Sequence, residues 1–398
     1  MSYYFEDLYE KMKNIWHEMP VTYDSYVGRY QRHKDKSLRS LNKSIKKNLR
    51  QLITGKESID HIIEEQLMTD IRTFAIKTLG MSSFAVDRIF RDEYFKHSQE
   101  FIKRAKELLP DIDGESLFQA LRNVWTMHSM QTYLNKAVEL TDSVFAYSML
   151  YPLTDNYLDD PNVSYEKKSE FNRRFRSKIQ TGEGLAQSEN EGRIFHMIDL
   201  IESEWPRDQY PKVYESLMAI LDGQQLSLKQ QNHSSLSDLD LLFITFYKGG
   251  ASVLADAYLI AGQLNASQED FAFMYGVILQ LADDLQDIKA DLSEKHMTMM
   301  NTQVQVGYLD ELINKYLNMI NVFFKEYYTL ETKGQKALNE LTFESIQLLI
   351  FEASMKSKKY ISKEMYEKVK VGSHFSPKAY QVVEKDFNKQ LRMVLGLS

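Results

Sequence analysis

One long stretch in the second half of this sequence contains no proline, and this limits the folds open to the chain. None of the seven prolines lies between Pro211 and Pro377. Apolar residues recur at steps of three and four along nearly the whole chain, which is the period of an amphipathic α-helix, and no convincing run of alternating residues indicates a strand. The sequence therefore predicts an all-α protein.

The composition narrows the classes of protein and of site. No apolar run approaches the length needed to span a bilayer, and the first residues lack the pattern of a secretion signal, so we expect a cytoplasmic protein without a transmembrane segment. The net charge of −7 disfavours nucleic-acid binding. Because cysteine is absent, any metal must be held by oxygen or imidazole ligands.

The N-terminal third carries a basic run. Residues 29–50 hold nine Lys or Arg against one Asp, on a segment whose Leu38, Leu41, Ile45 and Leu49 share one helical stripe. Such a run is most often a solvated helix face; the other interpretation is weak contact with phosphate or an anionic membrane surface. Pro110 and the turn after it indicate a boundary between a helical segment, 1–110, packed on a larger helical domain, 111–398.

The stretch "LQLADDLQDIKAD", residues 279–291, is acidic within an apolar neighbourhood. Ser267 and Asp270 have capping-box spacing, which predicts a helix from Gln268. On that helix Asp283, Asp284, Asp287 and Asp291 share about one quadrant, with Gln280 and Gly276 on the same side. Carboxylates so crowded repel one another, and hard cations such as Mg²⁺ favour carboxylate oxygens. A solvated acidic face is the alternative.

A second acidic segment, "DNYLDD", supports the metal interpretation. It places Asp155 and Asp159 one helical turn apart with Asp160 beside them, and Pro161 predicts that the helix ends there. Alone this segment reads equally well as a polar helix end. Two such clusters in one helical chain are a stronger signal than either.

These two segments resemble the aspartate-rich motifs of the class I terpenoid synthase superfamily, and most closely those of its trans-prenyltransferase branch. "QLADDLQD" is similar to the second motif of that family, and "DNYLDD" resembles a variant of the first, with Asn156 in place of an aspartate. The resemblance spans roughly residues 115–300. It implies a helical bundle around a central cavity, with three Mg²⁺ ions binding a prenyl diphosphate. As metal ligands it implies Asp155, Asp159, Asp160, Asp283, Asp284 and Asp287.

Three shorter matches imply residues that bind the diphosphate. "LDGQQLSL" is similar to a Gly-Gln segment between the motifs and contains Gln224, and "FYKGGASVLADAYLIAG" and "SEKHMT" place Lys248 and Lys295 where the family has lysines. Gln280 precedes the second motif, as in the family. Arg173 and Arg174 are weaker candidates, because paired arginines are more often solvated than functional.

Departures from the family favour one activity within it. The chain lacks the Gly-Lys-Arg segment that binds isopentenyl diphosphate in chain-elongating enzymes, and its paired arginines come late after the first motif. The resemblance therefore implies a lyase that ionises one linear prenyl diphosphate, cyclises the carbocation and releases diphosphate. A chain-elongating or head-to-head condensing enzyme is the alternative within the family, and a non-catalytic helical subunit is the alternative of another class. A homodimer is one assembly that the family allows.

The cavity of such an enzyme would be lined by apolar and aromatic side chains. Trp125, Phe145 and Phe271 lie near the motifs in sequence, although an aromatic at helical spacing belongs to the core by default. His128 and His196 could act as a final base, a role that released diphosphate could also fill.

Overall fold

The computed structural model describes residues 4–54, 57–87, 93–159, 163–231, 236–327, 329–383 and 385. Helices account for nearly all the ordered elements in these ranges, and no β-strand occurs in them. The predicted all-α class is confirmed. Among the described helices none is long and apolar enough to cross a membrane.

The chain forms two compact units. The first contains the chain up to His17, then Lys96–Leu281 and Lys295–Met297; the second contains Glu18–Phe95, Ala282–Glu294 and the chain from Thr298 onward. Both units combine segments from either side of residue 110, so they do not coincide with the segments 1–110 and 111–398, whose boundary stays a prediction.

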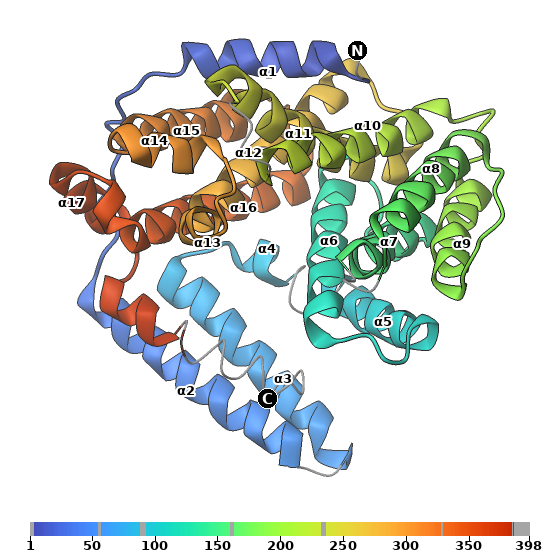
Figure 1. Ribbon diagram of the computed structural model, residues 1–398. Helices are drawn as coiled ribbons and strands as arrows, with labels where there is room; N and C mark the ends of the chain where they lie inside the picture. Colours follow the sequence, from blue (N-terminus) through green and yellow to red (C-terminus); the bar gives the residue numbers. More distant parts are fainter. Residues whose placement is uncertain are drawn as a thin grey trace. The chain divides into compact units, whose positions relative to one another are not determined.

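Two groups of helices build the first unit (Figure 1). α7 (Asp142–Asp159) packs against α6 (Gly114–Tyr133) and α9 (Glu189–Glu204), while α10 (Pro211–Ser227) packs against α11 (Asp238–Ala261) and α8 (Tyr165–Thr181). α11 also contacts α6 and α7, which joins the groups through one buried helix. The remaining helices are α1 (Glu6–Glu18), α5 (Glu93–Leu108), the 3₁₀ turn η3 (Leu228–Gln231) and most of α12 (Ala266–Gln286).

Side-chain caps fix where the helices begin. The Ser237 hydroxyl accepts from the N–H of Asp240, and Asp240 accepts from Ser237 in return, which starts α11. α12 begins two residues earlier than predicted, at Ala266. Its cap is the reciprocal pair of Asn265 and Gln268, joined by two bonds of 3.0 Å, so the predicted start at Gln268 is wrong.

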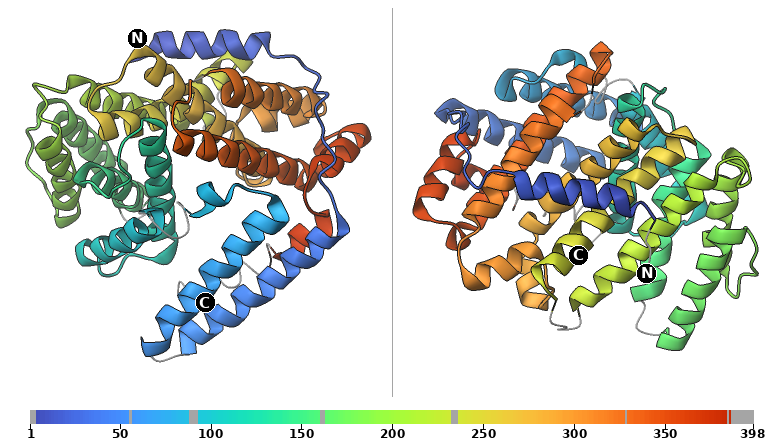
Figure 2. Two further views of the ribbon diagram at one scale, coloured as in Figure 1. Left: turned by 180° about the vertical axis from the view of Figure 1, so that it is seen from behind. Right: turned by 90° about the horizontal axis from the view of Figure 1, so that it is seen from above.

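The second unit pairs a helical hairpin with a group of C-terminal helices. α2 (Arg32–Thr54) and α3 (Glu57–Phe74) lie side by side and antiparallel, followed by the π-helical turn η1 (Ala75–Leu79) and α4 (Ser83–Asp87) (Figure 2). The other elements are α13 (Ile288–Glu294), α14 (Met299–Val306), α15 (Asp310–Val322), the π-helical turn η4 (Phe323–Tyr327), α16 (Lys333–Lys356), the 3₁₀ turn η5 (Lys358–Tyr360) and α17 (Lys363–Gly372).

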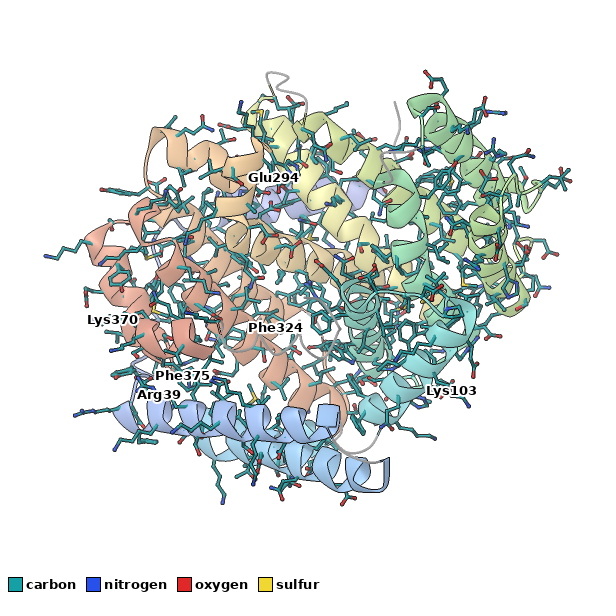
Figure 3. The ribbon with its side chains drawn as sticks, turned by 60° about the horizontal axis from the view of Figure 1, so that its bottom comes forward. Arg39, Lys103, Glu294, Phe324, Lys370 and Phe375 are labelled. Atoms are coloured by element: carbon teal, nitrogen blue, oxygen red, sulfur yellow. The ribbon has the colours of Figure 1, made fainter. Side chains whose placement is uncertain are left out.

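The basic run lies on α2, where its apolar residues and its basic residues occupy different faces of the helix. Leu38 is buried toward the neighbouring helices, whereas Lys36, Arg39 and Lys43 are exposed, with Arg39 labelled in Figure 3. Asp35, the one acid of the run, is buried and accepts from the N–H of Ser376 at 2.9 Å and from its hydroxyl at 2.6 Å. This pair ties the start of α2 to the C-terminal part of its unit.

Candidate active site

The first aspartate segment occupies the last two turns of α7. Asp155 and Asp159 have helical backbone there, and their side chains lie outside the described residues, as does all of Asp160. Pro152 lies inside this helix, which begins ten residues earlier at Asp142. α7 ends at Asp159, as the sequence predicts.

The second aspartate segment spans the end of α12 and the start of α13. Asp283 and Asp284 lie on the last turn of α12, Asp287 lies between the helices, and Asp291 lies on α13. The N–H of Asp287 donates to the carbonyl of Asp283, and that of Asp291 to the carbonyl of Asp287, both at 2.9 Å. These bonds carry the helical path across the junction and keep the aspartates near one another.

The acids of this segment do influence one another. Asp284 and Asp291 are buried, while Asp283 and Asp287 are exposed. Burial first, and then the charges of Asp284, Asp287, Glu294 and Asp283 in that order, together raise the pKa of Asp291 to about 7. A carboxyl group that holds its proton near neutrality is the expected result of crowding acids without a cation among them. Glu294 belongs to this cluster and was not predicted.

The fit of these residues to Mg²⁺ rests on their chemistry. All predicted ligands are carboxylates, the donors that Mg²⁺ prefers, and the raised pKa of Asp291 shows a local excess of negative charge. Within the described side chains, no three acidic or histidine groups converge closely enough to hold an ion by themselves. Asp155 and Asp159 fall outside that search. The donor set therefore suits Mg²⁺, and the ligand geometry stays a prediction.

Glycines bring three predicted diphosphate-binding residues onto adjoining helices of the first unit. A Cβ on Gly223 of α10 would stand 3.0 Å from the Cα of Lys248 on α11. A Cβ on Gly249 would stand 2.5 Å from the Cβ of Gln280 on α12. Lys248 and Gln280 take part in these two contacts, and Gln224 directly follows Gly223 in the chain.

A glycine at position 276 allows the close approach of a backbone or a ligand. The structure shows a backbone, since a Cβ there would overlap the carbonyl group of Gly249. The close contact of α11 and α12 depends on this pair of glycines.

Lys295 precedes a short segment fixed to the same unit. Met297 donates from its N–H to the carbonyl of Gln230 at 3.0 Å, and the Gln230 side-chain amide donates to the carbonyl of Met297 at 2.7 Å. Lys295 itself is exposed and has a left-handed backbone, with φ of 59°. Because Gln230 lies in the turn that follows α10, Lys295 is held near the C-terminal end of the helix that carries Gln224.

The two arginines of α8 have different surroundings. Arg174 donates from Nε to the buried Glu191 at 3.3 Å, and the two side chains form an ion pair. Glu191 also accepts from the N–H of Gln187 at 2.6 Å, so this pair holds α8 against the start of α9. Arg174 is therefore engaged within the protein, while Arg173 is exposed.

An apolar pocket that is partly open to solvent lies between α7, α8 and α10 in the first unit. Its lining is Tyr147, Leu150, Tyr151 and Thr154 of α7, Phe175 and Ile179 of α8, and Leu217, Ile220, Leu221 and Gln224 of α10. Thr154 directly precedes Asp155, and Gln224 is a predicted diphosphate ligand. One side of the pocket therefore adjoins residues that the sequence singled out.

α7 and α11 run antiparallel along this pocket. The hydroxyl groups of Tyr151 and Ser252 are 3.1 Å apart, and one turn further on Ser148, next to Tyr147, shares the side-chain amide of Asn123 with Asp256. The residue numbers sum to 403 for Tyr151 with Ser252 and to 404 for Ser148 with Asp256, which is the register of two antiparallel helices. Continued by one turn, the same register brings residue 155 of α7 level with residue 248 of α11.

The aromatic residues of the pocket were missed by sequence reasoning. Tyr147, Tyr151 and Phe175 line it, whereas Trp125, Phe145 and Phe271 do not. Trp125 is 38% exposed and donates to Ser98. The sequence held one signal for the two tyrosines: Tyr147 and Tyr151 precede Asp155 at steps of four residues, which places all three on one face of the same helix.

The two histidines also lie outside the pocket lining. His128 is buried, with Nδ1 3.0 Å from the side-chain oxygen of Gln131, and His196 is exposed on α9.

No model of a known protein family matches this sequence, and no curated protein is significantly similar to it.

Proposed function

We propose that this protein is a Mg²⁺-dependent class I terpene synthase, which ionises a linear prenyl diphosphate, cyclises the carbocation and releases diphosphate. The observation that carries the proposal is the placement of Gln224, Lys248 and Gln280 on three helices in glycine-mediated contact, beside an apolar pocket. That pocket runs along the helix that carries Asp155 and Asp159.

The polar side of the pocket suits the diphosphate. Lys248 carries a positive charge level with residue 155, and Gln224 contributes amide donors from the pocket wall. Charge-assisted hydrogen bonds from such groups stabilise the negative charge that develops on the leaving group. Mg²⁺ bound by Asp155, Asp159, Asp283, Asp284 and Asp287 would add positive charge at the same oxygens.

The apolar part of the pocket suits the hydrocarbon chain. Leu150, Ile179 and Leu221 exclude bulk water, which would otherwise quench the carbocation early. The rings of Tyr147, Tyr151 and Phe175 stabilise positive charge by about 0.5–2 kcal/mol each when they present a face to it.

Incubation with Mg²⁺ and linear prenyl diphosphates, from geranyl to geranylfarnesyl diphosphate, tests this activity. The proposal predicts diphosphate release and a cyclic product without isopentenyl diphosphate. A product longer than its substrate, formed only when isopentenyl diphosphate is added, would establish the chain-elongating alternative. Absence of diphosphate release from every substrate would favour the non-catalytic subunit.

We also propose that α2 makes weak contact with anionic membrane surfaces. Arg32, Lys36, Arg39, Lys43 and Lys47 are exposed on one face of this helix, in a row about 22 Å long, and none has an ion pair in the described part of the chain. A straight row of cations matches a plane of lipid phosphates. No aromatic side chain in the row could stack on bases, and the net charge of −7 opposes nucleic acid.

A further inference from the structure

Asp256 is a buried carboxyl group that the proposed ionisation does not use. It lies on α11 with 1% of its surface exposed. Its Oδ1 accepts from the side-chain amide of Asn123 at 3.5 Å, and its Oδ2 has no hydrogen-bond partner among the described residues. Burial raises the pKa of Asp256 well above its ordinary range, against the opposing effect of Asn123.

Tyr147 presents a second polar atom of the same kind. Its ring lines the pocket, and its hydroxyl is buried without a partner in hydrogen-bonding geometry among the described residues. The nearby hydroxyls of Tyr151 and Ser252 are bonded to one another. Burial, Tyr151 and Asp256, in that order, raise the pKa of Tyr147, while the Ser252 hydroxyl lowers it. Tyr147 and Asp256 each lie one helical turn from the facing pair of Tyr151 and Ser252, so they are neighbours across α7 and α11.

Two buried polar atoms that lie near one another without bonding form a site for a small polar group. Each loses its hydrogen bonds to solvent on burial, and a water molecule that bonds to both would restore them. An apolar ligand that fills the pocket would leave both atoms unsatisfied. The pair is therefore suited to a water molecule, or to a hydroxyl group of that size.

We infer that Tyr147 and Asp256 hold a water molecule beside the part of the pocket that Tyr147 lines, and that this water captures the carbocation, so that the product is a cyclic alcohol. The inference rests on the proposed function. It assigns Tyr147 and Asp256 as the residues that position the water, because each would donate to it or accept from it.

The reaction balances with water as the only added reactant. The C–O bond of the diphosphate ester breaks and its electron pair leaves with diphosphate. After cyclisation, a lone pair of the water oxygen forms the new C–O bond. The oxonium ion loses one proton, and the released diphosphate is its final acceptor. The sum is a prenyl diphosphate and water giving a cyclic alcohol and protonated diphosphate.

The place of the pair in the pocket determines which carbon reacts. Tyr147 lies eight residues before Asp155 on α7, which is about 12 Å along the helix. A substrate whose diphosphate lies at Asp155 therefore has its first carbon far from this water. Capture occurs at a carbon along the chain, after cyclisation.

The experiment is turnover in H₂¹⁸O with Mg²⁺ and the linear prenyl diphosphate that the protein accepts. Wild type is expected to give a cyclic alcohol containing ¹⁸O. Tyr147→Phe and Asp256→Asn should each lower the ratio of cyclic alcohol to hydrocarbon by about tenfold, while diphosphate release falls less. Tyr214→Phe is the matched control, because it removes a buried tyrosine hydroxyl bonded to the carbonyl of Trp205, outside the pocket. If Asp256→Asn does not fold, Tyr147→Phe carries the test.

The outcomes separate this inference from the proposed function. Diphosphate release with hydrocarbon as the only product overturns the inference and leaves the terpene synthase intact. If wild type releases no diphosphate from any substrate, the proposed function fails. A high-resolution crystal structure then decides whether the site exists: an ordered water bonded to Asp256 Oδ2 and the Tyr147 hydroxyl supports it, and a dry site overturns it.

Discussion

Gly249 and Gly276 hold α11 and α12 in backbone contact, so close that a Cβ on Gly249 would stand 2.7 Å from the carbonyl oxygen of Gly276. Because the obstacle is backbone, no side chain can move to make room. Gly276→Ala should separate the helices and reduce the free energy of unfolding by about 3 kcal/mol, which urea denaturation measures.

Gly192→Ala is the control for this prediction. Gly192 lies within α9, and a Cβ there would meet nothing within 4 Å. Alanine has the higher helix propensity, so this variant should gain about 0.5–1 kcal/mol. Equal stability of the two variants would contradict the glycine contact.

The raised pKa of Asp291 predicts a pH dependence of stability in metal-free buffer. In the unfolded chain this group releases its proton near pH 4, whereas in the native protein it keeps the proton to about pH 7. Between these values the native state binds more protons, so stability falls as pH rises and levels off above pH 7. Asp291→Asn should remove about 1–2 kcal/mol of this fall, after allowance for solvent screening.

Chemical denaturation across this pH range measures the effect. Asp208→Asn, at an exposed position in the first unit, controls for the loss of one carboxylate. A wild-type profile that keeps its slope in the Asp291→Asn variant would show that another group is responsible.

Binding of the leaving group can be measured without any substrate. Mg²⁺ together with inorganic diphosphate should raise the Tm by several degrees, because a ligand at a hundred times its Kd adds about 2.7 kcal/mol to the stability. Asp283→Ala with Asp287→Ala should abolish this rise, while Asp208→Ala should preserve it. An equal rise in the double variant would place the ligand elsewhere.

Vesicle binding tests the basic face of α2. The protein should sediment with vesicles that contain phosphatidylglycerol and not with pure phosphatidylcholine, and added salt should release it. The triple variant Lys36→Glu, Arg39→Glu, Lys43→Glu should lose at least about tenfold in affinity, since each cation contributes about 1 kcal/mol at such a surface.

A variant with the same change of charge elsewhere is the control. Lys103, Lys106 and Lys136 are exposed outside α2, and Lys103 is labelled in Figure 3. Their joint replacement by glutamate should weaken binding far less. Equal losses in both triple variants would indicate a response to net charge and not a specific face.

The helical class and the second aspartate cluster were predictable from sequence because both depend on local spacing. Apolar residues at helical steps determine which face of a helix is buried, and Asp284 and Asp291 influence one another because they lie on one helical path. Helix starts were less predictable. Ser267 and Asn265 are both good caps, and only the hydrogen bonds of the folded chain select Asn265.

The pocket could not be predicted, because it depends on which helices pack together. Tyr147 and Phe271 have the same helical surroundings in sequence, yet Tyr147 lines the pocket while the ring of Phe271 packs 4.8 Å from that of Tyr133. The ion pair of Arg174 with Glu191 joins residues 17 positions apart on different helices. Such pairings are set by tertiary contacts and leave no periodic signal.

The most direct test of the proposed function is diphosphate release from linear prenyl diphosphates with Mg²⁺, with extracted products identified by mass spectrometry. Wild type should release diphosphate and form a cyclic product from at least one substrate. Lys248→Met and Asp283→Ala should each reduce the rate by about a hundredfold or more, because both remove charge that stabilises the leaving group, and Gly192→Ala should keep it. Release that is unchanged in both charge variants, or absent from wild type with every substrate, would contradict the account.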